Sequence, residues 1–191
     1  MKDSNAKEYP TIACCGIDCG LCPRYYINGS SRCSGCGGKN FFDKHPSCSI
    51  LTCCLKKGFE TCADCDDFPC DRIKIWDKAD SFVTHKPCIK NLKSIKEKGI
   101  EIFLEQQNKR MQILEKLLLS FNEGRSKNFY CIATSLLSYE DLERVLSEAD
   151  KEINKKTIDI NDITSKSKLV KRMLLENAYE KKIELKLRKK S

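Results

Sequence analysis

Cysteines spaced two residues apart carry most of the chemistry that this sequence could perform. Three Cys-x-x-Cys pairs occur, at Cys19 and Cys22, Cys33 and Cys36, and Cys62 and Cys65. This spacing lets one tight turn direct both thiolates at a single ion, with backbone amides free to hydrogen-bond the sulfurs. Four thiolates suit a tetrahedral metal ion, so the pairs predict metal sites of the tetrathiolate type, with four cysteines to each ion.

Further cysteines lie within reach of these pairs, and together they form the predicted ligand set. The predicted metal ligands are Cys15, Cys19, Cys22, Cys33, Cys36, Cys48, Cys53, Cys62, Cys65 and Cys70. These thiolates fill two four-coordinate sites with two left over, or three sites if another cysteine or His45 joins them. His45 itself fits an exposed turn at Lys44-His45-Pro46 more simply. We therefore expect two or three ions per chain.

The order of the cysteines suggests a simplest way of sharing them. One site would combine Cys19 and Cys22 with Cys33 and Cys36, a second would combine Cys48 and Cys53 with Cys62 and Cys65, and Cys15 and Cys70 would remain for a third. Only ten residues separate the first two pairs, which is shorter than the roughly 15–20 of a usual zinc ribbon. Interleaved sites are therefore an alternative to this pairing.

Zinc is the favoured cofactor, with an iron–sulfur cluster as the alternative. Zinc takes thiolates tetrahedrally, and its sites replace the hydrophobic core that a loop-rich segment cannot build. The spacing Cys15-x3-Cys19-x2-Cys22 would also hold a [4Fe–4S] cluster, as it does in radical S-adenosylmethionine enzymes. Such enzymes have a large barrel fold that this short chain does not offer, so only a bare redox or sensing cluster remains as the alternative.

Composition limits where and how the protein works. Charged residues make up 32% of the chain, and no apolar run approaches the roughly 20 residues of a membrane span. Residues 1–10 contain no apolar stretch of signal-peptide length, so a cytoplasmic location is expected. A reducing cytoplasm does not sustain disulfides, which favours metal ligation for most of the 14 cysteines.

The composition changes after Cys88, and this change predicts the domain organisation. All five prolines and 13 of the 14 cysteines precede residue 89, and the chain from residue 89 onward has helical periodicity. The predicted fold is mainly α with an irregular, metal-stabilised Cys-rich N-terminal domain of the zinc-knuckle or ribbon-like kind. The predicted segments are a polar arm (1–10), the Cys-rich domain (11–88), an α-helical segment (89–150), a linker (151–164) and a basic amphipathic helical tail (165–191).

The helical half suggests partners rather than a reaction. Helices are expected over residues 89–98, 100–122 and 129–137, and Ser138-Tyr-Glu-Asp141 fits a capping box that opens a helix to about residue 150. Residues 166–191 carry 10 Lys and Arg against 3 Glu, or +7 of the formal net charge of +8. Such a tail could bind nucleic acid or an acidic partner, and it could equally be a solvated helix end. A protein partner could dock on the helical segment.

The order of the motifs resembles a known family. Cys15-Gly-Ile-Asp-Cys19-Gly-Leu-Cys22-Pro23, then Cys33-Ser-Gly-Cys36, then Cys62-Ala-Asp-Cys65-Asp-Asp-Phe68-Pro69-Cys70 are similar to the Cys-rich bacterial and archaeal family known as domain of unknown function 3795. The resemblance implies metal binding by the cysteines and no particular substrate. Cys14 and Cys54 look like additions to its pattern. The sequence thus predicts a zinc-binding interaction or regulatory module with structural tetrathiolate sites and no assignable reaction.

Overall fold

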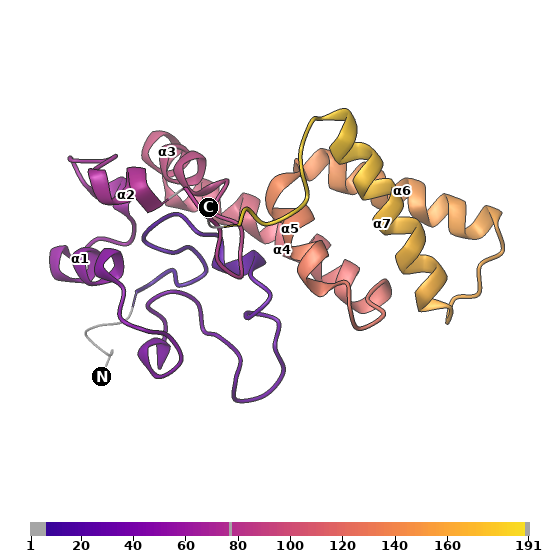
Figure 1. Cartoon of the computed structure of the whole chain (residues 1–191), viewed down its shortest axis with the longest axis horizontal. Coiled ribbons are helices and arrows are strands. Elements are labelled where there is room, and N and C mark those ends of the chain that lie inside the picture. The colour runs from indigo at the N-terminus through magenta and orange to yellow at the C-terminus, as the bar shows by residue number, and fades with distance from the viewer. Residues whose placement is uncertain (1–6, 77, 190–191) are drawn as a thin grey trace. The chain divides into compact units, whose positions relative to one another are not determined.

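The protein is mainly helical. The computed structural model describes residues 7–76 and 78–189, and these contain seven α-helices and no extended strand (Figure 1). The helices are α1 (Ser49–Lys57), α2 (Asp71–Trp76), α3 (Cys88–Lys98), α4 (Ile100–Ser120), α5 (Lys127–Leu136), α6 (Tyr139–Lys155) and α7 (Ile163–Glu180). The prediction of a mainly α protein with an irregular Cys-rich N-terminal region is confirmed.

The chain forms two compact units. The first, here called the cysteine unit, runs to Gln107 and also takes in the chain from Leu187 onward. The second, the helical unit, is Asn108–Lys186. The division falls inside α4, whose first two turns complete the cysteine unit and whose remainder starts the helical unit.

Loops and short helical turns make up most of the cysteine unit. Besides α1, α2 and α3, it contains the 3-10 turns η1 (Cys19–Leu21), η2 (Phe41–Asp43) and η3 (Cys62–Asp64). Gly16 lies between two predicted ligands with a φ of +86°, and a Cβ there would lie 2.3 Å from the carbonyl oxygen of Cys88. Glycine therefore lets the loop from Cys15 to Cys19 pack directly on the start of α3.

A small core holds the cysteine unit together, and cysteines form part of it. The fully buried side chains of Ile12, Leu51 and Leu92 pack in one cluster that also contains Cys14 and Cys54. Gln107 of α4 closes the unit by donating hydrogen bonds to the Thr11 carbonyl (2.9 Å) and to Asp18 Oδ1 (2.7 Å). Asp18 lies between Ile17 and Cys19, so α4 helps to position the first cysteine loop.

The helices predicted after residue 88 are present, with different ends. α3 ends at Gly99, whose φ of +91° gives the helix its predicted glycine stop. Ser138 caps α6 by accepting a hydrogen bond from the Asp141 amide (3.1 Å), as the capping motif predicts. α6 continues to Lys155, so part of the predicted linker is helical.

The helical unit packs α5, α6 and α7 around buried aromatic and aliphatic side chains. α6 lies against α7 (Figure 1). Tyr130 of α5 is fully buried, and its hydroxyl donates to the Phe121 carbonyl (2.9 Å) and lies 3.0 Å from Ser167 Oγ of α7. The stability of this unit comes from ordinary apolar packing and from hydrogen bonds that its own side chains supply.

The basic tail is only partly helical. α7 ends at Glu180, so Ile183 and Leu187 do not continue its amphipathic face. Arg188 instead pairs with Asp80 of the cysteine unit, with 2.9 Å between Arg188 Nη2 and Asp80 Oδ1. Residues 190 and 191, like residues 1–6 of the predicted polar arm, lie outside the described residues.

Candidate metal centre

The ten predicted ligands line two separate cavities of the cysteine unit. Four of them, Cys53, Cys62, Cys65 and Cys70, line a cavity of about 40 Å³, here called the small thiol cavity. The other six, Cys15, Cys19, Cys22, Cys33, Cys36 and Cys48, line a cavity of about 370 Å³, here called the large thiol cavity. Every predicted ligand therefore faces one of two spaces that could hold a bound group.

The small thiol cavity is built where α1, η3 and the start of α2 meet. α1 contributes Cys53 together with Cys54, which also lines the cavity. Thr61 fixes η3 with a capping box, in which its Oγ1 accepts from the Ala63 amide (3.2 Å) and its own amide donates to Asp64 Oδ2 (2.8 Å). This local geometry presents Cys62 and Cys65 together, as a two-residue spacing requires.

Two contacts in the small thiol cavity are relevant to metal binding. The Sγ atoms of Cys54 and Cys62 are 3.8 Å apart. Two thiolates on one tetrahedral zinc ion, with bonds near 2.3 Å, would be separated by about 3.8 Å as well. Lys57 places its ammonium 3.7 Å from Cys65 Sγ, where its charge stabilises a thiolate.

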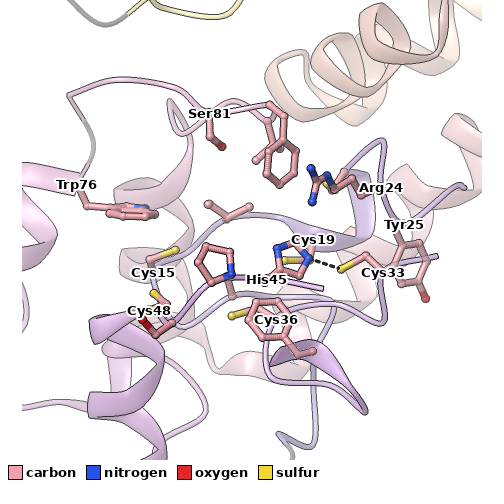
Figure 2. Close-up of a pocket in the computed structure, with 18 of the residues that line it drawn as sticks. Cys15, Cys19, Arg24, Tyr25, Cys33, Cys36, His45, Cys48, Trp76 and Ser81 are labelled. Carbon is pink, nitrogen blue, oxygen red and sulfur yellow. Dashed lines mark hydrogen bonds between the residues drawn. The ribbon is translucent and has the colours of Figure 1, made fainter. Parts of the chain in front are cut away.

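The large thiol cavity is formed by loops rather than by helices. Figure 2 shows Cys15 and Cys48 at one end and Cys33 at the other, with Cys19, Cys36 and His45 between them. His45 stacks on Phe41, with ring centroids 4.4 Å apart and an angle of 11° between the planes. Its Nε2 lies 3.3 Å from Cys33 Sγ, close to the roughly 3.5 Å expected for a thiolate and an imidazole on one tetrahedral zinc.

An arginine provides the positive charge at the large thiol cavity. Arg24 lines this cavity and lies over the ring of Phe82, 4.3 Å from its centroid. Burial has the largest effect on the pKa values of Cys22 and His45. It raises the pKa of the Cys22 thiol and lowers the pKa of the His45 imidazole. The charge of Arg24 acts to lower both pKa values. Burial therefore favours the neutral thiol of Cys22. Burial and the charge of Arg24 both favour the neutral imidazole of His45, and the neutral imidazole is the form that binds a metal ion.

Burial affects the other thiols of the large cavity in the same direction. It raises the pKa of Cys15 to about 12 and that of Cys19 well above its usual range. A buried thiolate is unstable without a cation to balance it, so these side chains are neutral at pH 7 unless one binds. Thiols of this kind release protons when a metal ion occupies their site.

Two further cysteines, Cys14 and Cys54, belong to the core. Cys14 is buried in the same cluster as Cys54 and Cys36 of the large thiol cavity, and its Sγ donates to the Glu60 carbonyl (3.5 Å). The Cys14 carbonyl also accepts from the amide of Cys62 (2.9 Å). The core that contains Cys14 and Cys54 therefore also includes Cys15 and Cys36 of the large thiol cavity.

The structure groups the ligands differently from the simplest sequence pairing. Cys48 lies in the large thiol cavity, away from Cys53, Cys62 and Cys65, while Cys70 joins those three. His45 was predicted to lie in an exposed turn, but its ring faces Cys33. The position of His45, three residues before Cys48, was the available signal. Within residues 7–76 and 78–189, no three Cys, His, Asp or Glu side chains already surround a single point as a closed metal site.

Comparison with known proteins agrees with the cysteine motifs. Residues 11–75 match the family model described as Protein of unknown function (DUF3795), which confirms the resemblance predicted from those motifs. No curated protein and no solved structure matches the chain. Among the described residues, no helix has the length and apolarity to cross a membrane.

Proposed function

We propose that the protein binds zinc through its cysteines and that these ions stabilise the fold of the cysteine unit. The observation that carries this proposal is the distribution of the predicted ligands, because all ten line one of two cavities. Four predicted ligands around the small thiol cavity match the number that one tetrahedral zinc ion takes.

The architecture of the cysteine unit supports a structural role for the ions. Its described part consists largely of loops, 3-10 turns and the short helices α1 and α2, with a core to which cysteines contribute. A bound ion would join segments that are distant in the sequence, such as α1 and the loop after η3. Such cross-links replace apolar packing in small domains.

Metal analysis of the full chain tests the proposal. The protein would be purified without oxygen or added metal, and zinc, iron and acid-labile sulfide would be measured per chain. We expect zinc without sulfide, and we expect a chelator to release the zinc and lower the melting temperature. Iron with acid-labile sulfide would instead favour the alternative, a cluster with a redox or sensing role.

A matched pair of variants separates ligands from other buried cysteines. Cys65→Ser should remove the ion of the small thiol cavity, because serine does not replace a thiolate as a zinc ligand. Cys131→Ser is the control, since Cys131 is also buried but belongs to α5 in the helical unit. Full zinc content and an unchanged melt in both Cys65→Ser and Cys19→Ser would contradict the proposal.

A further inference from the structure

The large thiol cavity contains more donors than one zinc ion can use. Six thiols and the imidazole of His45 line it, whereas a tetrahedral ion takes four ligands. Two tetrahedral ions have eight coordination positions between them. Seven donors fill eight positions when one thiolate bridges both ions. The number of donors in this cavity therefore matches a site that holds two metal ions.

The donors also divide into two groups that share one member. At one end Cys33 lies 3.3 Å from His45, and the Cys33 amide donates to the carbonyl of Arg24, two residues after Cys22 (3.1 Å). Cys15 and Cys48 lie at the other end, and Cys36 lies between the two ends (Figure 2). Donors therefore lie at opposite ends of one cavity, Cys15 and Cys48 at one end and Cys33 at the other, which points to two ions rather than one (Figure 2).

Cys19 is the cysteine that connects these groups. Its thiol lines the same cavity as Cys15 and Cys36 of one group and Cys22 of the other. Figure 2 shows Cys19 between the two ends of the cavity. The backbone explains this position, because η1 starts at Cys19 and turns the chain so that Cys15 precedes the turn and Cys22 ends it.

The volume of the large thiol cavity and the charge near it also favour two zinc ions that share one thiolate. The large thiol cavity has a volume of about 370 Å³ against about 40 Å³ for the small one. Two separate tetrathiolate zinc sites would carry a charge of about −4, whereas two zinc ions sharing six thiolates carry about −2. A single nearby guanidinium, that of Arg24, balances the smaller charge more completely.

We propose that the large thiol cavity holds two zinc ions bridged by the Cys19 thiolate. Cys15, Cys36 and Cys48 complete the coordination of one ion, and Cys22, Cys33 and His45 complete that of the other. This inference rests on the proposed zinc binding and deepens it. With one ion in the small thiol cavity, the chain then binds three zinc ions.

Cadmium-113 NMR of the full chain tests the bridge directly. Zinc would be replaced by ¹¹³Cd²⁺, which accepts the same ligands, and the spectrum would be recorded with and without cadmium–cadmium decoupling. We expect three resonances, two of them split by mutual coupling through the shared sulfur. Cys65→Ser should remove only the uncoupled resonance, and His45→Gln should shift mainly one member of the coupled pair. The spectrum of the unmodified chain shows whether two ions share a thiolate, even if a variant fails to fold.

The outcomes of this experiment separate the bridged pair from the proposed function. Two uncoupled resonances with two ions per chain would overturn the bridged pair and leave zinc binding intact. A chain that binds neither zinc nor cadmium would overturn both. Iron with acid-labile sulfide in the purified protein would also overturn the Cys19 bridge, because sulfide would then join the metal ions.

Discussion

Replacing Glu123 by glutamine should destabilise the helical unit in a pH-dependent way. Glu123 lies in the turn between α4 and α5, where its carboxylate accepts hydrogen bonds from Ser126 Oγ (2.6 Å) and Ser167 Oγ (2.6 Å) and pairs with Lys171 Nζ (3.1 Å). It thus joins the turn to α7. Burial alone would raise the pKa of this carboxyl, but the hydrogen bonds from Ser126, Ser167 and Lys171 outweigh it and lower the pKa to about 2.

The size of the effect follows from these contacts. Hydrogen bonds to a charged group contribute about 1.5–3 kcal/mol each, but glutamine keeps one acceptor and the side chain is 19% exposed. We therefore expect a loss of about 2 kcal/mol in the free energy of unfolding at pH 7. For a chain of this size, that corresponds to a fall of roughly 4–8 °C in melting temperature.

The sign of the pH dependence follows from the lowered pKa. The carboxylate stabilises the folded state fully above its unfolded pKa of 4.5, and this contribution is lost as the pH falls toward about 2. Urea unfolding followed by circular dichroism at 222 nm should show a large difference between the two proteins at pH 7 and a smaller one at pH 3. Glu115→Gln is the control, since Glu115 is exposed on α4, the helix that precedes the turn with Glu123. Equal stability at pH 7, or a difference that stays constant down to pH 3, would refute the reasoning.

Two further substitutions test the packing of the cysteine unit. Gly16→Ala should lower its free energy of unfolding by at least about 2 kcal/mol, because the new Cβ would lie 2.3 Å from a backbone carbonyl of α3. Gly29→Ala, also at positive φ but with nothing within 4 Å, should cost only about 1 kcal/mol, and equal losses in thermal melts would contradict this account. Asp80→Asn should cost about 2 kcal/mol, because the Asp80 side chain is fully buried against Arg188. Trypsin should then cleave the chain near Arg188 faster, and an unchanged cleavage rate would argue against that anchor.

The helices after residue 88 could be predicted because local signals determine them. Glycine at residue 99 and serine at residue 138 end and begin helices through their own backbone and side-chain geometry, whatever packs around them. α1 was not predicted, although Ile50, Leu51 and Cys54 are buried at helical spacing, because the segment Ser49–Lys57 is short and its two adjacent cysteines were interpreted as part of a loop. Its end at Gly58, with a φ of +70°, was the one local signal available.

The grouping of the ligands could not be predicted, because it depends on tertiary packing. Cys48 is the residue just before α1 and Cys53 lies within the helix, five residues further on. Five residues turn a helix through about 140°, so the two thiols face different directions although they are neighbours in the sequence. Cys70 joins Cys62 and Cys65 only because the chain bends between η3 and α2. Spacing therefore identifies the cysteines that act in pairs but not the pairs that share a site.

The charges of the cysteine-rich segment and of the tail determine how well the predicted nucleic acid or acidic partner could bind. Residues 1–88 carry 12 Lys and Arg against 11 Asp and Glu, so ten thiolates on three zinc ions would make this segment negative overall and repel phosphate. The tail offers less free charge than its composition indicates, because Lys171, Arg172 and Arg188 already pair with Glu123, Glu176 and Asp80. Lys181 and Lys186 likewise pair with Asp141 and Glu184, so an acidic partner would have to displace intramolecular carboxylates. Any binding through the tail should therefore be weak and should fall steeply as salt concentration rises.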